Sequence, residues 1–550
     1  MSVTHYICKY TPVELLEALG GQCAVLDYMP EDFDRSDQVT HPNLCGFGKA
    51  LLEACMEGRV KELVLVNCCD TIRSAYDVLL EHGQLDFLFL MDMLHTSADH
   101  ARARTKGELL RLARAYAAYK GTAFDPERFR AAFRPVQRPA EPYVSVLGGR
   151  VGDALFSLME ESMPLPLRND TCVHARSVAP PVEDLPFDAL MDWYAGALLD
   201  QLPCMRMTDV GGREQLYTDP HLQGVIYHTV KFCDYYGFEY SHLRKELTVP
   251  LLKLESDYTI QSSGQLRTRL EAFAESIAPR QTVQKGAPTM KNGKGYYVGI
   301  DSGSTSTDVA ILDQDRNIVA QVILPTGAGA AAGADRALEE ALRQAGLTQA
   351  DITATVTTGY GRSAIQRGDQ SITEITCHAK GAFFLDPEVR TIIDIGGQDS
   401  KVIRIDEAGN VVNFVMNDKC AAGTGRFLEL MARTLEISLD EMSTAGLDWT
   451  EDITISSMCT VFAESEVVSL IAQNKAPADI IHGLDRSVAS KTCALCRRVG
   501  GEAKYMMTGG VSKNRGVVAE LERQLGVELA ISDKAQLNGA LGAALFAMEL

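Results

Sequence analysis

Residues 296–313, YYVGIDSGSTSTDVAILD, contain an apolar strand that ends in Asp301, a turn rich in Gly and Ser, and a second strand. Residues 390–406, RTIIDIGGQDSKVIRID, repeat this plan around Asp394. Each run alternates strand and turn residues over a short length, as hairpins do. Two copies of one plan predict a duplicated α/β architecture that binds a ligand between its lobes.

The turns of both copies suit phosphate. Glycine has no side chain to block the approach of a phosphate oxygen to backbone N–H groups. The candidate phosphate contacts are Gly303, Ser304 and Thr305 in the first turn and Gly396, Gly397 and Gln398 in the second. Asp301 and Asp394 end their strands at the same predicted cleft, and two carboxylates beside polyphosphate favour hydrated Mg²⁺.

A third turn lies near the end of the chain, in YMMTGGVSKNRGVVAELERQLG (505–526). Gly509 and Gly510 would let a flat base or ribose lie against the backbone, and Lys513 and Asn514 complete the candidate nucleotide contacts. One glycine turn is weak evidence for a ligand. Three in order, two of them with an aspartate at the strand end, favour a nucleotide site.

The first half of the chain alternates strands and helices. The predicted strands lie in KELVLVNCCD (61–70), LDFLFLMD (85–92), PYVSVLGG (142–149) and QGVIYHTVKFCD (223–234). Such alternation predicts parallel sheets covered by helices. A new series of alternating strands and helices begins at Tyr143, which divides this half into subdomains 1–140 and 141–280.

A change in composition separates the halves. PRQTVQKGAPTMKNGKG (279–295) is rich in Lys, Gly, Pro and Gln and lacks apolar periodicity. We assign 281–295 as a linker and 296–550 as the C-terminal domain.

The net charge and the apolar segments of the chain exclude several classes of protein. The net charge of −20 argues against a general nucleic-acid binder. The N-terminus lacks the pattern of a signal peptide, and LDFLFLMDML (85–94) is too short and too charged to span a membrane. We therefore expect a cytoplasmic protein with no membrane partner, whose 14 cysteines are thiols or metal ligands.

The second half resembles a known family throughout 296–550. The motifs that carry the resemblance are GIDSGSTSTDVAIL (299–312), TTGYGR (357–362), EITCHAKGA (374–382), DIGGQDSK (394–401), NDKCAAGTGRFLE (417–429), CTVFAESEV (459–467), TGGVSKNRGVV (508–518) and AQLNGALGAALFA (535–547). Together they resemble the ATP-dependent activators of 2-hydroxyacyl-CoA dehydratases and benzoyl-CoA reductases. Those activators belong to the actin, Hsp70 and sugar-kinase fold class.

The resemblance implies an ATP hydrolase of anaerobic metabolism whose homodimer shares one [4Fe-4S] cluster. Its electron donor would be a ferredoxin or flavodoxin. The matching ligands are Cys420 and Cys459, each before a predicted helix, where the thiolate is favoured. A cluster normally takes four thiolates, so two per chain require two chains. The alternative is that both are buried structural cysteines.

Other residues of the second half have less specific roles. Gly423-Thr424-Gly425 is interpreted as the start of a helix beside the nucleotide cleft, and it either contacts phosphate or hinges the helix. Glu374 is a candidate catalytic residue, with Asp301 and Asp394, that orients water or magnesium. Cys377 and His378 pack near the cleft. Cys493 and Cys496 share one helix face and are predicted to be helix core, not a zinc site.

The first half resembles the cluster-bearing subunits of the same dehydratases and the double-cubane cluster proteins. The motifs are YTPVELLEALGG (10–21), HPNLCGFGKALLE (41–53), VNCCDTIRSAYDVL (66–79), QGVIYHTVKFCDYYGFEY (223–240), VPLLKLESDYT (249–259) and GQLRTRLEAFAE (264–275). The resemblance implies Cys45, Cys69 and Cys233 as ligands of a [4Fe-4S] or double-cubane cluster between the subdomains. Cys204 is the rival third ligand, and buried structural cysteines are the alternative.

The sequence therefore predicts a fusion in which ATP hydrolysis drives low-potential electron transfer to the first half or to separate dehydratase or reductase subunits. Three alternatives remain. The second half is a small-molecule kinase of the same fold class, or it is a non-catalytic, Hsp70-like ATP switch that holds a partner, or the first half is only a docking domain.

Overall fold

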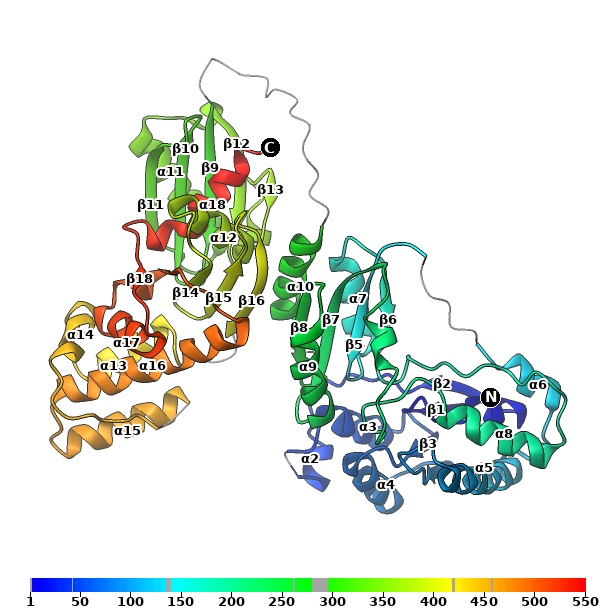
Figure 1. The fold of residues 1–550 in the computed structure, drawn as a ribbon. Helices are drawn as coiled ribbons and strands as arrows, with labels where there is room; N and C mark the ends of the chain where they lie inside the picture. The colour runs from blue at the N-terminus through cyan, green and yellow to red at the C-terminus, as the bar shows by residue number, and fades with distance from the viewer. Residues whose placement is uncertain are drawn as a thin grey trace. The chain divides into compact units, whose positions relative to one another are not determined.

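The computed structural model describes residues 2–41, 43–134, 140–260, 263–278, 295–417, 421–456 and 459–550. The chain forms two compact units, Met1–Ile277 and Ala278–Leu550 (Figure 1). The linker assigned to 281–295 lies outside the described residues except for Gly295.

The first unit contains two sheets, and both are parallel throughout. One has the order β2-β1-β3-β4. Its strands are β1 (Val3–Tyr6), β2 (Gln22–Val25), β3 (Glu62–Val66) and β4 (Phe87–Met91). The helices of this part are α1 (Val13–Ala18), α2 (Ser36–Val39), α3 (Gly46–Met56), α4 (Asp70–His82), α5 (Asp99–Lys120), α6 (Pro126–Ala131) and α8 (Phe187–Leu199). Every residue of β3 is buried, as expected for an inner strand of a parallel sheet.

The second sheet of this unit has the order β6-β5-β7-β8. Its strands are β5 (Tyr143–Gly148), β6 (Leu167–Asn169), β7 (Leu222–Val230) and β8 (Leu251–Ser256). Its helices are α7 (Asp153–Ser162), α9 (Asp234–Glu246) and α10 (Ser263–Ile277). Helix α8 follows this sheet's first two strands in sequence but packs against α5 beside the other sheet (Figure 1). The prediction of parallel sheets in the first half is confirmed.

The second unit has two five-stranded sheets built on one plan, ordered β11-β10-β9-β12-β13 and β16-β15-β14-β17-β18. The strands of the first are β9 (Tyr296–Ser302), β10 (Ser306–Asp313), β11 (Ile318–Pro325), β12 (Ile352–Thr358) and β13 (Gln370–Ser371). Those of the second are β14 (Thr391–Ile395), β15 (Ser400–Ile405), β16 (Val411–Asn417), β17 (Tyr505–Thr508) and β18 (Leu529–Ala530). In each sheet three strands form an antiparallel meander and two join in parallel, which confirms the duplication.

Helices complete both lobes of the second unit. The first lobe has α11 (Ala330–Ala345), α12 (Glu374–Leu385) and α18 (Asn538–Ala547). The second has α13 (Gly425–Thr434), α14 (Leu439–Ala445), α15 (Thr460–Ala472), α16 (Pro477–Val499) and α17 (Arg515–Leu525). Helix α16 begins with Pro477 in its first turn and ends at Gly500 in the left-handed conformation, which are favoured start and stop residues.

Helix α16 also resolves one prediction about cysteines. Cys493 and Cys496 are buried in the core of the second lobe, which confirms their assignment to a helix core.

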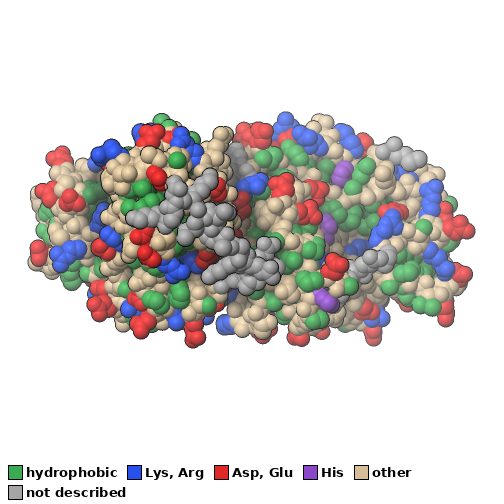
Figure 2. Space-filling view, turned by 90° about the horizontal axis from the view of Figure 1, so that it is seen from above, with side chains coloured by type: hydrophobic (Ala, Val, Ile, Leu, Met, Phe, Trp, Pro, Cys, Tyr) green, Lys and Arg blue, Asp and Glu red, His purple; other side chains and the backbone are tan. Residues whose placement is uncertain are grey.

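Acidic and basic side chains are intermixed on the face of the molecule drawn in Figure 2. Across the described part of the chain, every helix is too short or too polar to cross a bilayer.

Candidate functional site

The duplicated hairpins of the second unit bring the two predicted phosphate turns face to face. The first turn joins β9 to β10, and the N–H of Gly303 donates to the carbonyl of Ser306 at 2.9 Å. The second joins β14 to β15, and the N–H of Gly396 donates to the carbonyl of Asp399 at 3.0 Å. A Cβ added at Gly397 would overlap Oγ1 of Thr305, so glycine is required for this close approach.

His378, on α12, lies between the two aspartates that precede these turns. Its Nε2 is 3.7 Å from Oδ2 of Asp301, and its Nδ1 is 3.5 Å from Oδ1 of Asp394. Burial opposes a charge on this ring, but the two carboxylates prevail and raise the pKa of His378 to about 9. The amide of Asn538, at the start of α18, lies 3.2 Å from Nδ1 and also donates to the His378 carbonyl at 2.9 Å.

A buried lysine neutralises the acidic groups on the other side of Asp394. Nζ of Lys401 lies 2.7 Å from Asp399, 3.3 Å from Asp394 and 3.6 Å from Glu374. Burial raises the pKa of Glu374 to about 7, and Lys401 acts in the opposite direction. Glu374 is therefore a carboxyl group that can take up or release a proton near neutral pH.

The third predicted turn starts beside Asp394. The hydroxyl of Thr508, the last residue of β17, donates to Oδ1 of Asp394 at 2.9 Å. Gly509 has φ of 81°, and a Cβ there would overlap the carbonyl oxygen of Ile395. Next to Gly510 there is open space where a Cβ would stand. The backbone at this turn is therefore accessible to a flat ligand.

Lys513 and Asn514 have structural contacts of their own. Nζ of Lys513 donates to Oε1 of Gln536 at 2.7 Å. The side chain of Asn514 accepts from the N–H of Val517 at 2.9 Å and so caps α17. In this structure Asn514 stabilises the helix that follows the turn.

These residues fit a magnesium–nucleotide complex. Oγ1 of Thr305 is buried between the turns without a hydrogen-bond partner. Asp301 and Asp394 lie near the ends of the equivalent strands β9 and β14 of the two sheets, and they are hard oxygen donors of the kind that Mg²⁺ takes. Among the described residues, no group of three or more His, Cys, Asp and Glu side chains is arranged to hold a metal ion by protein ligands alone. Mg²⁺ at phosphate sites usually has only one or two carboxylates and takes its other ligands from phosphate and water.

Helix α13 is attached directly to the second phosphate turn. The N–H groups of Gly425 and Arg426 donate to the carbonyls of Gly396 and Gly397 at 2.9 and 2.8 Å. Gly423, with φ of 96°, redirects the chain just before the helix. Through these bonds, the first N–H groups of α13 are paired with carbonyl groups of the turn. Cys420 itself lies outside the described residues.

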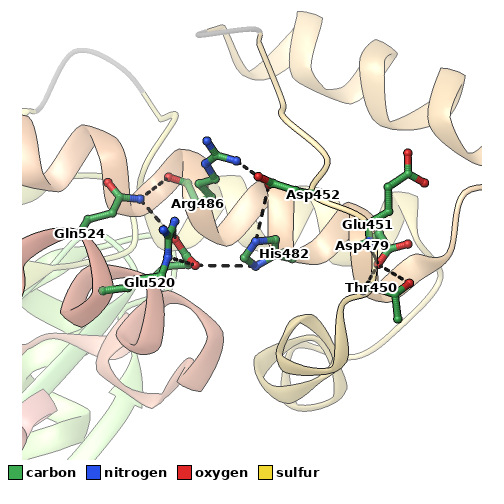
Figure 3. Close-up of polar contacts among 9 residues, drawn as sticks. Thr450, Glu451, Asp452, Asp479, His482, Arg486, Glu520 and Gln524 are labelled. Atoms are coloured by element: carbon green, nitrogen blue, oxygen red, sulfur yellow. Dashed lines mark hydrogen bonds and ion pairs between the residues drawn. The ribbon is translucent and has the colours of Figure 1, made fainter.

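Cys459 is exposed and stands at the N-cap of α15. The segment before it is fixed to α16, where the ring of Trp449 stacks on His482 with centroids 4.2 Å apart. Figure 3 shows His482 between Asp452 and Glu520, with its ring nitrogens 4.0 and 3.8 Å from their carboxylates. Nearby, Asp479 accepts from the N–H of Thr450 at 2.6 Å. These contacts hold residues 449–452, which precede Cys459 in the chain, against α16, and His482 connects α16 to α17.

In the first unit, the three predicted ligands have equivalent positions. Cys45, Cys69 and Cys233 are the N-caps of α3, α4 and α9. In each case a backbone N–H of the first helical turn favours the thiolate; these belong to Gly48, Ile72 and Tyr236. The two parallel sheets contribute these helices, so the thiols come from both subdomains.

Electrostatic effects also connect the three thiols. Burial raises the pKa of Cys45 and brings that of Cys233 to about 11. The neighbouring Cys68 thiol, followed by burial, raises the pKa of Cys69. Cys45 and Cys69 each act to raise the pKa of Cys233 further, so the three thiols lie within electrostatic range of one another. Thiolates are the ligands that iron–sulfur clusters take, although no three His, Cys, Asp or Glu side chains of the described residues already stand as the ligands of a metal ion.

The rival ligand Cys204 has a different environment. It is buried on the loop after α8, and its Sγ lies 3.5 Å from the hydroxyl of Tyr236. Burial opposes ionisation, but Arg206, Tyr236 and Lys9 together lower its pKa. It does not cap a helix as the other three cysteines do.

Several residues of the nucleotide site were not identified as functional from the sequence. The sequence assigns no role to Lys401 or Thr508 and predicts only that His378 packs near the cleft; the structure puts the His378 ring between Asp301 and Asp394. The Asp-Ile-Gly-Gly-Gln-Asp-Ser-Lys spacing was a usable signal. In a hairpin, Lys401 pairs directly across from Asp394.

Two facing phosphate turns, two strand-end aspartates and a duplicated sheet define an ATPase-type domain of the actin, Hsp70 and sugar-kinase class. Family comparisons agree. The model of the BadF/BadG/BcrA/BcrD ATPase family matches residues 298–547. The chain belongs to this family. The model of the 2-hydroxyglutaryl-CoA dehydratase D-component matches residues 8–141 and 138–277 of the other unit. Both resemblances expected from the sequence are confirmed.

Two individual relatives support the same assignment by their sequences. The activator of lactoyl-CoA dehydratase from Anaerotignum propionicum is 50% identical over 254 residues, covering 46% of this chain and 98% of the relative. The (R)-2-hydroxyglutaryl-CoA dehydratase activating ATPase of Acidaminococcus fermentans is 48% identical over 253 residues, covering 46% and 96%. The crystal structure of component A of that dehydratase is 47% identical, with a TM-score of 0.45, and covers 46% of this chain and 98% of that one.

Proposed function

We propose that this protein couples ATP hydrolysis in residues 296–550 to low-potential electron transfer into an iron–sulfur site in residues 1–280 or in a partner subunit. One observation carries the proposal. A single polypeptide joins a unit of the activating ATPase family to a unit that matches the dehydratase D-component. The linker, 281–295, raises the effective concentration of each unit near the other.

The geometry of the second unit supports the following nucleotide contacts. The turns at 303–305 and 396–398 bind the phosphates through backbone N–H groups, and Gly509 and Gly510 face the nucleoside. Asp301 and Asp394 hold Mg²⁺. Glu374, with a pKa of about 7, orients the attacking water and accepts its proton.

Helix α13 is the proposed connection from the nucleotide to the cluster ligands. Its first N–H groups are bonded to the turn at Gly396 and Gly397, so a shift of that turn on hydrolysis moves the helix and the segment that contains Cys420. Cys420 and Cys459, with the same residues of a second copy, hold one [4Fe-4S] cluster across a homodimer. Such a cluster, when bound, stores one electron received from a ferredoxin or flavodoxin.

In the first unit, Cys45, Cys69 and Cys233 are the proposed ligands of a [4Fe-4S] or double-cubane cluster. We prefer Cys233 to Cys204 as the third ligand because Cys233 shares the N-cap position of the other two. Helix N-termini at all three thiols stabilise the negative charge that ligation requires.

Iron content and ATPase activity of the anaerobically reconstituted full chain test this proposal. We expect both, with part of the iron lost in Cys459→Ser and a different part lost in Cys45→Ser. If Cys45→Ser retains all the iron of the unmodified chain, the first unit is a docking domain only. Phosphorylation of a small acceptor without bound iron would favour the kinase alternative.

A further inference from the structure

The duplicated sheets of the second unit each place a row of three polar residues beside a predicted phosphate turn. In the second lobe, Asp394 on β14 pairs with Lys401 on β15 and with Thr508 on β17. Nζ of Lys401 lies 3.3 Å from Asp394, and the hydroxyl of Thr508 donates to the same carboxylate at 2.9 Å. This buried carboxylate therefore has a cation on one side and a hydrogen-bond donor on the other.

The equivalent row of the first lobe contains a second acid where the second lobe has the lysine. Asp301 on β9 pairs with Asp308 on β10 and with Thr358 on β12. Residues directly opposite each other in an antiparallel pair lie on one face of the sheet, with Cβ atoms about 4.5–5.5 Å apart. The two carboxylates are therefore neighbours, and Asp308 has the position that Lys401 has in the other lobe.

The contacts that balance the second row are missing from the first. Asp308 is 6% exposed, and its Oδ1 is buried without a hydrogen-bond partner. Thr358 is fully buried, and its hydroxyl has no partner either. Among the described residues, no Lys or Arg lies within ion-pair distance of Asp301 or Asp308, and His378 forms an ion pair only with the first of them. Two neighbouring buried carboxylates need a cation between them in order to be ionised together.

The row of the first lobe also lies next to the first phosphate turn. Asp301 and Asp308 face each other across the hairpin of β9 and β10, near its closed end, where the turn at 303–305 joins the two strands. The start of α18 covers the same face of the sheet, since a Cβ added at Gly539 would lie 2.0 Å from Oδ2 of Asp301. A cation between the two carboxylates would therefore be close to a phosphate bound at the turn.

We propose that Asp301 and Asp308 hold a divalent cation between them, so that Asp308 is a third carboxylate of the magnesium–nucleotide site. The ion has the place in the first lobe that the ammonium group of Lys401 has in the second. Mg²⁺ suits this place because it binds one or two carboxylates and takes its other ligands from phosphate and water. The inference rests on the proposed function, which supplies the phosphates.

Binding of Mn²⁺ in place of Mg²⁺ tests the proposal. The full chain with one equivalent of ADP is titrated with Mn²⁺, and free Mn²⁺ is measured by electron paramagnetic resonance at room temperature. Asp308→Asn removes the charge at nearly constant shape, and Asp308→Lys supplies the ammonium group of the other lobe. Asp335→Asn is the control, since Asp335 forms a partly exposed pair with Arg367 at 2.9 Å in the same lobe. Circular dichroism checks folding, and calorimetry in EDTA checks ADP binding.

We expect Asp308→Asn to weaken Mn²⁺ binding by about 10–100-fold, the loss typical when a group that supports a metal site is removed. Asp308→Lys should weaken it further, and Asp335→Asn should match the parent. The proposal is overturned if either substitution of Asp308 keeps the parent's affinity for Mn²⁺, or if the control loses as much. Failure of the proposed function looks different, because the parent protein itself would then not bind ADP.

Discussion

Lys401→Met would remove the lysine that neutralises a group of three carboxylates. Lys401 is 4% exposed, and its Nζ lies within 3.6 Å of Asp399, Asp394 and Glu374. Loss of one partner from a buried ion pair costs about 3–5 kcal/mol. We therefore expect the free energy of unfolding of the second unit to fall by about 3–5 kcal/mol at about pH 8.

The stability loss caused by Lys401→Met should be smaller at acidic pH, because Glu374 is then protonated. Its folded pKa of about 7 is above the ordinary carboxyl range, so its ionisation destabilises the native protein as pH rises toward 7. Without Lys401, which opposes that increase, the pKa rises further and more stability is lost above pH 7. At about pH 5 Glu374 is protonated in both proteins, and this part of the difference disappears.

Urea unfolding measures both effects. The chain has two tryptophans, and Trp193→Phe leaves Trp449 as the reporter of the second unit. Lys380→Met is the matched control, since Lys380 forms an exposed pair with Glu549 at 2.6 Å that is worth at most about 1 kcal/mol. The reasoning is refuted if Lys401→Met and Lys380→Met lose equal stability at about pH 8, or if the loss does not depend on pH.

Other substitutions test separate contacts of the nucleotide site. Gly397→Ala would drive a methyl group into Thr305 and should weaken binding of a non-hydrolysable ATP analogue by about 1–3 kcal/mol in calorimetric titration; unchanged affinity would contradict the facing turns. The pKa of His378 is raised to about 9, so its stabilising contribution is complete below its ordinary pKa of 6.5 and is lost as pH rises through 9. His378→Asn should lack that alkaline loss in urea unfolding. Thr508→Val removes a hydroxyl from the buried carboxylate of Asp394 and should cost about 1.5–3 kcal/mol of stability in the same assay.

The duplicated hairpins could be predicted because their information is local. The strand at 296–302 and its copy at 391–395 each end near an aspartate and a glycine turn, and both patterns lie within one short window. The parallel sheets of the first unit followed from strand–helix alternation for the same reason. Residues that meet through long-range packing were harder to predict.

His378 illustrates that limit. It contacts Asp301 and Asp394 because α12 packs between the two lobes beside α18, where Asn538 fixes its ring. Nothing within the motif EITCHAKGA encodes the approach of α18, which starts 160 residues later in the chain.

Because α13 is bonded to the Gly396–Gly397 turn, a movement of that turn can be transmitted along the helix. The helix has 10 residues, so it is about 15 Å long. Its far end meets the helix of Cys459, where the hydroxyl of Thr434 donates to Glu464 at 3.4 Å. A tilt of about 10° at the turn would displace that end by roughly 2.6 Å, a sideways step comparable to the helix shifts of known switches. On the proposed function, the loss of one phosphate at the turn would be magnified where α13 meets the helix that Cys459 caps.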